Sequence, residues 1–162
     1  MFFNIHLNVM ILYIFSGPNL IDVKDQEFYR KLTEKKVAAV EDGIRIAVIY
    51  LEGKDNPNYT SDDRLNRLKA EEIIGDDWKT KLSKPLEAKT FTYLIYKLLK
   101  LKGGLTTRVF GASERYAYRE CISLGLVKAN GENRYISGQE MLGVIKRVKE
   151  LEKRVKSRED EY

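Results

Sequence analysis

The sequence predicts an all-α protein of five or six helices, in which two related helix–loop–helix units pack around a shared core. Apolar residues follow the helical period of about 3.6 residues in residues 86–101 and again in residues 136–151. The two stretches also match each other at an offset of fifty positions. The matched pairs are Leu86 with Ile136, Phe91 with Met141, Leu94 with Val144, Ile95 with Ile145, Leu98 with Val148 and Leu101 with Leu151.

The totals of the chain are those of one globular domain, which we place at residues 19–151 of the 162. A net charge of +5 favours acidic partners such as nucleic acid, anionic lipid headgroups or acidic wall polymers. Lys and Arg alternate with Asp and Glu along most of the chain, however, and an ordinary solvated surface has the same pattern.

The single cysteine, Cys121, and the single histidine, His6, exclude an internal disulfide and a Cys/His zinc site. Cys121 stands among apolar residues, which is typical of a small buried side chain and not of a nucleophile. No catalytic constellation and no phosphate-binding glycine loop is found. We therefore expect no enzyme, no metal, no cofactor and no small-molecule substrate.

Residues 1–15 form the most apolar run, which is shorter than the roughly 20 residues that a membrane-spanning helix needs. It is similar to the apolar region of a secretory signal, and the small residues Ser16 and Gly17 follow it. We therefore predict a signal or apolar leader over residues 1–18 and a location in the periplasm or cell envelope. No Lys or Arg precedes the run, and a buried N-terminal strand or helix is the alternative.

In the first half of the chain, residues 19–30 are polar and predict a linker or a short helix. A helix is predicted over residues 33–51, with Thr33 as its N-cap. Its buried stripe consists of Val37, Val40, Ile44, Ala47, Val48 and Leu51.

Turn-forming residues 52–63 lead to a helix over residues 64–73, capped by Ser61 or Asp62. Trp78 and Leu82 are expected to return to the core from a short helix or turn, before a helix over residues 89–101.

In the second half, residues 105–112 predict an irregular connection, and Ser113 caps a helix that ends near Leu124. Residues 134–136 form a short extended piece, and the last helix starts at Ser137. The charged tail, residues 152–162, is expected to fray into solvent.

These elements predict two copies of one unit, at residues 64–101 and 113–151, each with a shorter helix, a loop and a longer helix. Residues 33–51 could be the long helix of a third, truncated copy. A unit of this size cannot bury its own apolar stripe, so the copies must pack against each other.

The second copy resembles the S-layer homology module. The resemblance rests on Leu124-Gly125-Leu126-Val127, followed by Ile136-Ser137-Gly138-Gln139-Glu140, and it spans residues 64–151. Ser137 and Glu140 stand at the family's Thr and Glu and have the spacing of a capping box. The resemblance implies a helical fold that binds an anionic wall polymer. Gly138 and Ala88 stand where the family has an arginine that helps to hold this polymer.

We therefore expect a non-catalytic binding module of the cell envelope, whose partner is a cell-wall polymer or an envelope protein. The predicted contact surface is the groove between the copies. Its ligand-binding residues are Arg108, Arg115, Arg119, Arg134 and Tyr118.

A cytoplasmic winged-helix protein is the alternative, with residues 113–124 as the DNA-recognition helix and residues 128–136 as the wing. Two features oppose it. Residues 106–113 leave too little chain for the preceding helix, and Glu114 and Glu120 balance Arg115 and Arg119.

Overall fold

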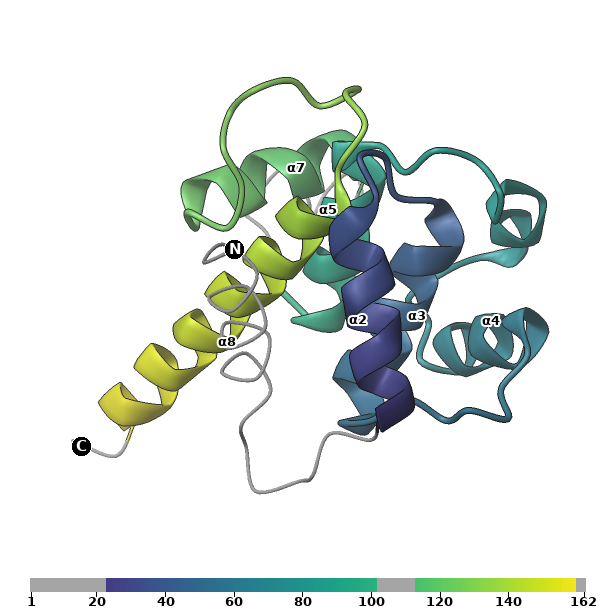
Figure 1. Cartoon of the computed structure of the whole chain (residues 1–162). Helices are drawn as coiled ribbons and strands as arrows, with labels where there is room; N and C mark the ends of the chain where they lie inside the picture. Colours follow the sequence, from purple (N-terminus) through teal and green to yellow (C-terminus); the bar gives the residue numbers. More distant parts are fainter. Residues whose placement is uncertain (1–22, 102–112, 160–162) are drawn as a thin grey trace, which may run out of the picture.

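The computed structural model describes residues 23–101 and 113–159, which contain six α-helices and one 3₁₀ helix (Figure 1). In chain order the helices are α2 (Val23–Glu34), α3 (Val40–Glu52), α4 (Ser61–Ala70), η1 (Asp76–Lys81), α5 (Ala88–Leu98), α7 (Glu114–Ser123) and α8 (Gly138–Glu159). Two isolated backbone bridges, but no strand, occur in these ranges. The all-α prediction is therefore confirmed. The predicted leader (1–18) and the predicted irregular connection (105–112) lie outside the described residues.

The helix predicted over residues 33–51 is wrong, because the structure has two helices there. Helix α2 ends at Glu34, and the chain is extended around Ala38 before α3 begins at Val40. Val37, which was expected in the buried stripe, is 46% exposed. The polar stretch before Thr33 is thus a helix of 12 residues and not a linker.

Thr33 is accordingly not an N-cap. Its hydroxyl donates to the Arg30 carbonyl at 2.7 Å, inside the last turn of α2. Helix α3 is capped by Asp42, whose carboxylate accepts the Ala39 N–H at 2.8 Å.

Helix α4 begins at Ser61, three residues before its predicted start at residue 64, and Thr60, not Ser61 or Asp62, is its N-cap. The Thr60 side chain accepts the Asp63 N–H at 3.2 Å, and the Asp63 carboxylate accepts the Thr60 N–H at 2.8 Å. The helix ends at Ala70, before the predicted end at residue 73. The predicted Ser113 cap of α7 is confirmed, since its hydroxyl accepts the Tyr116 N–H.

The charged tail does not fray at residue 152 as predicted, because α8 continues to Glu159. The Tyr50 hydroxyl on α3 donates to the Glu152 carboxylate and holds this turn of α8 against the bundle. No helix in the described ranges combines the length and the apolar character needed to cross a bilayer.

Three extended residues, Ala38, Leu86 and Ile136, form a closed ring of backbone hydrogen bonds. The Ala38 N–H donates to the Ile136 carbonyl (2.9 Å), the Ile136 N–H to the Leu86 carbonyl (3.0 Å) and the Leu86 N–H to the Ala38 carbonyl (2.8 Å). Each ring residue lies two positions before a long helix (α3, α5 or α8), and each is fully buried. Three helix–loop–helix segments therefore meet at this ring, where the sequence predicted two copies and raised residues 33–51 as the long helix of a truncated third.

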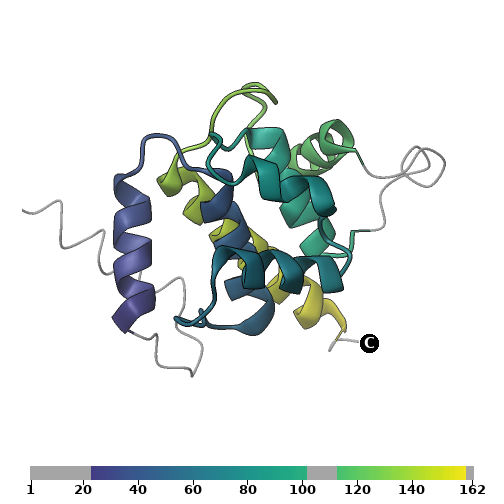
Figure 2. The same cartoon turned by 90° about the vertical axis from the view of Figure 1, so that its right-hand side faces the viewer.

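The helices also pack in a cycle. Each shorter helix lies on the long helix of the preceding segment: α4 on α3, α7 on α5, and α2 on α8, which joins the first segment to the last. Figure 2 shows α2 and α7 at opposite sides of the bundle, with the long helices between them. The long helices fill the centre with buried residues from equivalent turns, among them Ile46, Ala47, Phe91, Leu94, Ile95, Met141, Val144 and Ile145. The core is thus built from all three segments.

Candidate functional site

The predicted contact residues Tyr118 and Arg134 lie close to the loop that connects α7 to α8. Tyr118 is 5% exposed, and its hydroxyl donates to the Lys128 carbonyl at 3.1 Å. The Arg134 guanidinium binds the Glu140 carboxylate through both Nη atoms, with Nη1 2.7 Å from Oε2. Its Nε donates to the Asn130 side chain at 2.6 Å. The hydrogen bonds that Arg134 donates to Glu140 raise the pKa of this arginine, and its charge is already matched.

The other predicted arginines are less engaged. Arg115 is exposed, and its Nε lies 3.8 Å from the Glu132 carboxylate. Arg119 is exposed one turn further along α7. Arg108 lies outside the described residues. The structure thus brings Arg115, Tyr118 and Arg134 to one loop, but carboxylates accompany two of these three side chains.

The loop itself is not a wing of strands. Residues 128–136 contain turns and one isolated bridge, from Tyr135 to Glu87 of the preceding segment. No observation in the described ranges favours the winged-helix alternative, which stays a prediction.

A different cationic site lies between α2, α3 and α4, in a pocket of about 280 Å³. Its lining brings together four cations and two carboxylates, and two apolar side chains complete it. The lining residues are Phe28, Lys31, Leu32, Lys35, Glu41, Asp42, Arg45 and Arg64.

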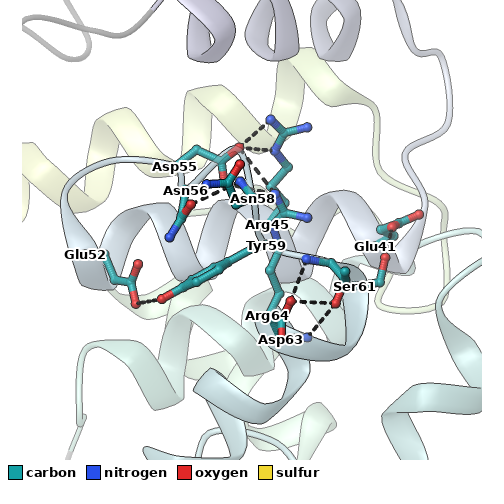
Figure 3. A network of polar contacts seen from close by, with 11 residues as sticks. Glu41, Arg45, Glu52, Asp55, Asn56, Asn58, Tyr59, Ser61, Asp63 and Arg64 are labelled. Carbon is teal, nitrogen blue, oxygen red and sulfur yellow. Dashed lines mark hydrogen bonds and ion pairs between the residues drawn. The ribbon is translucent and has the colours of Figure 1, made fainter.

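Asp55, in the loop between α3 and α4, organises two of these cations (Figure 3). It is 4% exposed. Arg45 donates to its carboxylate from Nε (2.8 Å) and from Nη2, and Arg64 Nη2 lies 3.2 Å from its other oxygen. The Arg45 guanidinium also lies 4.0 Å from the centre of the Phe28 ring, in cation–π geometry. Both guanidinium groups are therefore held in fixed positions.

Arg64 keeps unused hydrogen-bonding capacity although it is buried. Its residue is 8% exposed, and its Nε has no hydrogen-bond partner among the described residues. A buried donor without a partner costs roughly 1–3 kcal/mol. Lys35 stands at the same pocket and binds both oxygens of Asp42 at 2.7 and 2.8 Å.

A second pocket, of about 260 Å³, lies between α2, α3 and α8. Its lining includes the apolar Ile46, Ile49 and Ile145 together with Lys149 and Glu152. Burial is the main cause that lowers the pKa of Lys149 and raises that of Tyr50. This pocket lacks the cluster of cations found between α2, α3 and α4.

The cationic pocket could not be found in the sequence for a concrete reason. Lys31 and Lys35 share one side of the α2 region only if the chain is helical up to Lys35, whereas the sequence left residues 19–30 as a linker or a short helix and placed a helix start at Thr33. Arg45 and Arg64 come from different helices and meet through Asp55, which looked like one polar residue of a turn-rich loop. The signal that could have helped is the (i, i+4) lysine pair itself.

The described residues contain no group of three or more His, Cys, Asp or Glu side chains that could hold a metal ion. The fold and the pocket thus define a small all-α protein with a cationic pocket between helices. Comparison with known family models, with curated proteins and with solved structures finds no match for this chain.

Proposed function

We propose that this chain is a non-catalytic binding module of the periplasm or cell envelope, which holds an acidic group of a wall polymer between α2, α3 and α4. The observation that carries the proposal is the buried Arg64, whose Nε lacks a partner beside Arg45, Lys31 and Lys35. Carboxylates and phosphates are the usual partners of such arginine groups, because the guanidinium offers several donors in one plane.

The resemblance to the S-layer homology module supports an anionic polymer as the class of ligand. It does not support binding through the residues that the family uses. At the position of the family's arginine this chain has Ala88 and Gly138, and the equivalent residue of the first segment is Val40, where α3 begins. The cations of the proposed site come instead from the side of α2 and α3 and from the first turn of α4. The loop around Arg134 is a weaker candidate, because Glu140 and Glu132 already lie beside its arginines.

Retention on purified peptidoglycan that carries its acidic polymers tests the proposal. We expect the full chain to be retained at low salt and released at high salt. Replacing Lys31 and Lys35 together by Ser should release it at low salt as well. These lysines are exposed and already pair with Glu27 and Asp42, so the fold should tolerate their loss.

The matched control replaces Lys79 and Lys81 by Ser. Lys79 is exposed and Lys81 is half-buried. Both pair with carboxylates, those of Asp62 and Asp77, but they lie on η1 and do not line the pocket. Equal losses in both double variants would mean that net charge alone causes retention, and the pocket would be discarded. If the chain bound an acidic protein but was not retained on the polymer, the proposed partner would become a protein.

A further inference from the structure

The backbone ring of Ala38, Leu86 and Ile136 presents an unusual outer face. In an extended segment, successive side chains point to opposite sides. The ring side chains point into the core, and the preceding residues, Val37, Pro85 and Tyr135, are exposed. The hydrogen bonds of the ring, 2.8–3.0 Å long, keep these three residues at one end of the bundle, where α2 ends and α8 begins (Figure 1).

A basic residue precedes each exposed apolar residue. The three equivalent pairs are Lys36 with Val37, Lys84 with Pro85 and Arg134 with Tyr135. Arg134 is bound to Glu140, but Lys36 and Lys84 are exposed and form no ion pair with any residue of the described ranges. We call the surface formed by these six residues the ring face.

Most other large apolar side chains in the described ranges are not exposed as those of the ring face are. Within residues 26–101 and 113–155, three large hydrophobic side chains are exposed: Val37 (46%), Tyr135 (55%) and Val155 (50%). Two of the three are on the ring face. Exposed apolar residues gathered on one surface indicate an interaction site, whereas single ones need no explanation.

We propose that the ring face docks on an anionic lipid bilayer. Val37, Pro85 and Tyr135 enter the headgroup region, and Lys36 and Lys84 contact the lipid phosphates. Tyrosine suits this boundary because its ring is apolar and its hydroxyl reaches water. The hydrogen bonds of the ring hold the backbone next to Val37, Pro85 and Tyr135 in place. These residues therefore lose little conformational entropy when they contact the bilayer.

Two other occupants fit less well. A second copy of the chain would bring the unpaired Lys36 and Lys84 close to the same two lysines of its partner. The surface of six side chains is also much smaller than the roughly 800 Å² per partner of a stable interface. A soluble acidic polymer would use the lysines but gain little from Val37, Pro85 and Tyr135. A bilayer accepts single inserted side chains and attracts the lysines at the same time.

The test is co-sedimentation of the full chain with vesicles of phosphatidylcholine alone and with vesicles that also contain phosphatidylglycerol. We expect binding to the anionic vesicles, which Val37→Asp with Tyr135→Asp abolishes. Replacing one of Lys36 and Lys84 by Ser should lower partitioning about fivefold, as expected for one basic residue at an anionic surface. The apolar run of residues 1–15 is present in every variant, so its contribution cancels in the comparison.

Two controls keep the test specific. Val155→Asp places the same change at an equally exposed residue of α8 and should leave binding unchanged. The Lys31 and Lys35 double variant should also bind vesicles normally, so that failure of the polymer proposal and failure of this one are distinguishable.

Insertion itself is measured by the fluorescence of the Tyr135→Trp variant, whose tryptophan emission should shift to the blue when anionic vesicles are added. Trp78 is 4% exposed and provides a constant background. Equal binding of wild type and the double Asp variant would overturn the proposal. So would an unshifted emission of the Tyr135→Trp variant, or a ring face that binds poly-glutamate but not vesicles.

Discussion

Gly138 connects the first and last segments of the chain through a close contact of backbones. A Cβ atom at this position would lie 1.8 Å from the Leu32 carbonyl oxygen of α2. The Gly138 N–H also donates to the Lys35 carbonyl at 3.1 Å. A side chain at this position would not fit here without moving α2. The absence of a side chain at residue 138 thus has a steric reason in this chain.

Gly138→Ala should therefore destabilise the protein by about 3 kcal/mol, at the upper end for overpacking, because backbone and not a flexible side chain must move. Urea unfolding followed by circular dichroism measures the change. The control is Gly143→Ala, in the same helix, where the nearest atoms are those of the Arg147 guanidinium at 3.6 Å. That variant should gain up to about 1 kcal/mol from helix propensity. Equal effects at both sites would contradict the predicted close contact.

Cys121 is a second residue whose behaviour follows from its surroundings. It is fully buried, and its thiol lies 3.7 Å from the Thr92 carbonyl, to which it donates weakly. Burial, with a smaller effect of Glu120, raises its pKa to about 12. Since the thiolate is the reactive form, we expect the native protein to resist disulfide reagents at mildly alkaline pH. Labelling in urea should follow the unfolding curve, and fast labelling without denaturant would show that the site is open.

At the scale of elements, the capping box of α4 permits a direct test of where this helix starts. Thr60→Ala removes the side chain that accepts the Asp63 N–H and should cost about 1 kcal/mol. Asp62→Ala removes one of the caps expected from the sequence and should change stability by less than about 0.5 kcal/mol. Thermal unfolding of both variants decides between them. A larger effect at residue 62 would restore the cap predicted from the sequence.

The same box makes part of the stability depend on pH. Hydrogen bonds from the Thr60 side chain and backbone lower the pKa of Asp63 in the folded state. A carboxyl group with a lowered folded pKa stabilises above its unfolded pKa, and this contribution is lost as the pH falls through the folded value. The difference between wild type and Thr60→Ala should therefore shrink on acidification. A difference that stays constant with pH would mean that the ionised state of Asp63 does not contribute to the cap.

Local sequence signals predicted helix starts and caps well where the residues that set them lie within or next to the same helix. The Ser113 cap of α7 was predicted correctly, α8 begins one residue after its predicted start at Ser137, and α5 begins one residue before its predicted start. They failed between α2 and α3. Apolar spacing continues through this break, while the backbone of residues 35–38 bonds to residues 136 and 138 of the last segment. A pattern read over neighbouring residues cannot indicate a backbone hydrogen bond to a residue about a hundred positions away.

At the scale of the whole molecule, the ring predicts coupled opening of three distant sites. The N–H groups of Ala38, Leu86 and Ile136 each donate within one closed cycle. Loss of one segment removes a partner from the other two, so their amide protons should exchange with opening free energies within about 1 kcal/mol of each other. The Asn130 N–H, in the exposed loop before α8, should exchange much faster. Native-state hydrogen exchange measures this, and fast exchange at Ile136 alone would show that the last segment opens independently.

The cationic pocket also belongs to this scale. Its cations come from α2 and the residue after it, from α3 and from α4, and each is unremarkable in its own stretch of sequence. Packing of α4 on α3 places Arg64 beside Asp55, and the same carboxylate orients Arg45. Of the arginines singled out from the sequence, those in the described ranges lie on α7 and in the loop after it, where Glu132 and Glu140 accompany Arg115 and Arg134. Charge along the chain therefore did not reveal which cations share one cavity.

The sequence by itself determined the all-α class, the long helices α5 and α8 and the cap of α7, because helical periodicity and capping depend on residues a few positions apart. The tertiary structure decided the break between α2 and α3, the ring that joins three segments and the pocket around Arg64. In each of these a backbone group or a charge finds its partner in a distant part of the chain, and that choice is made only when the segments pack.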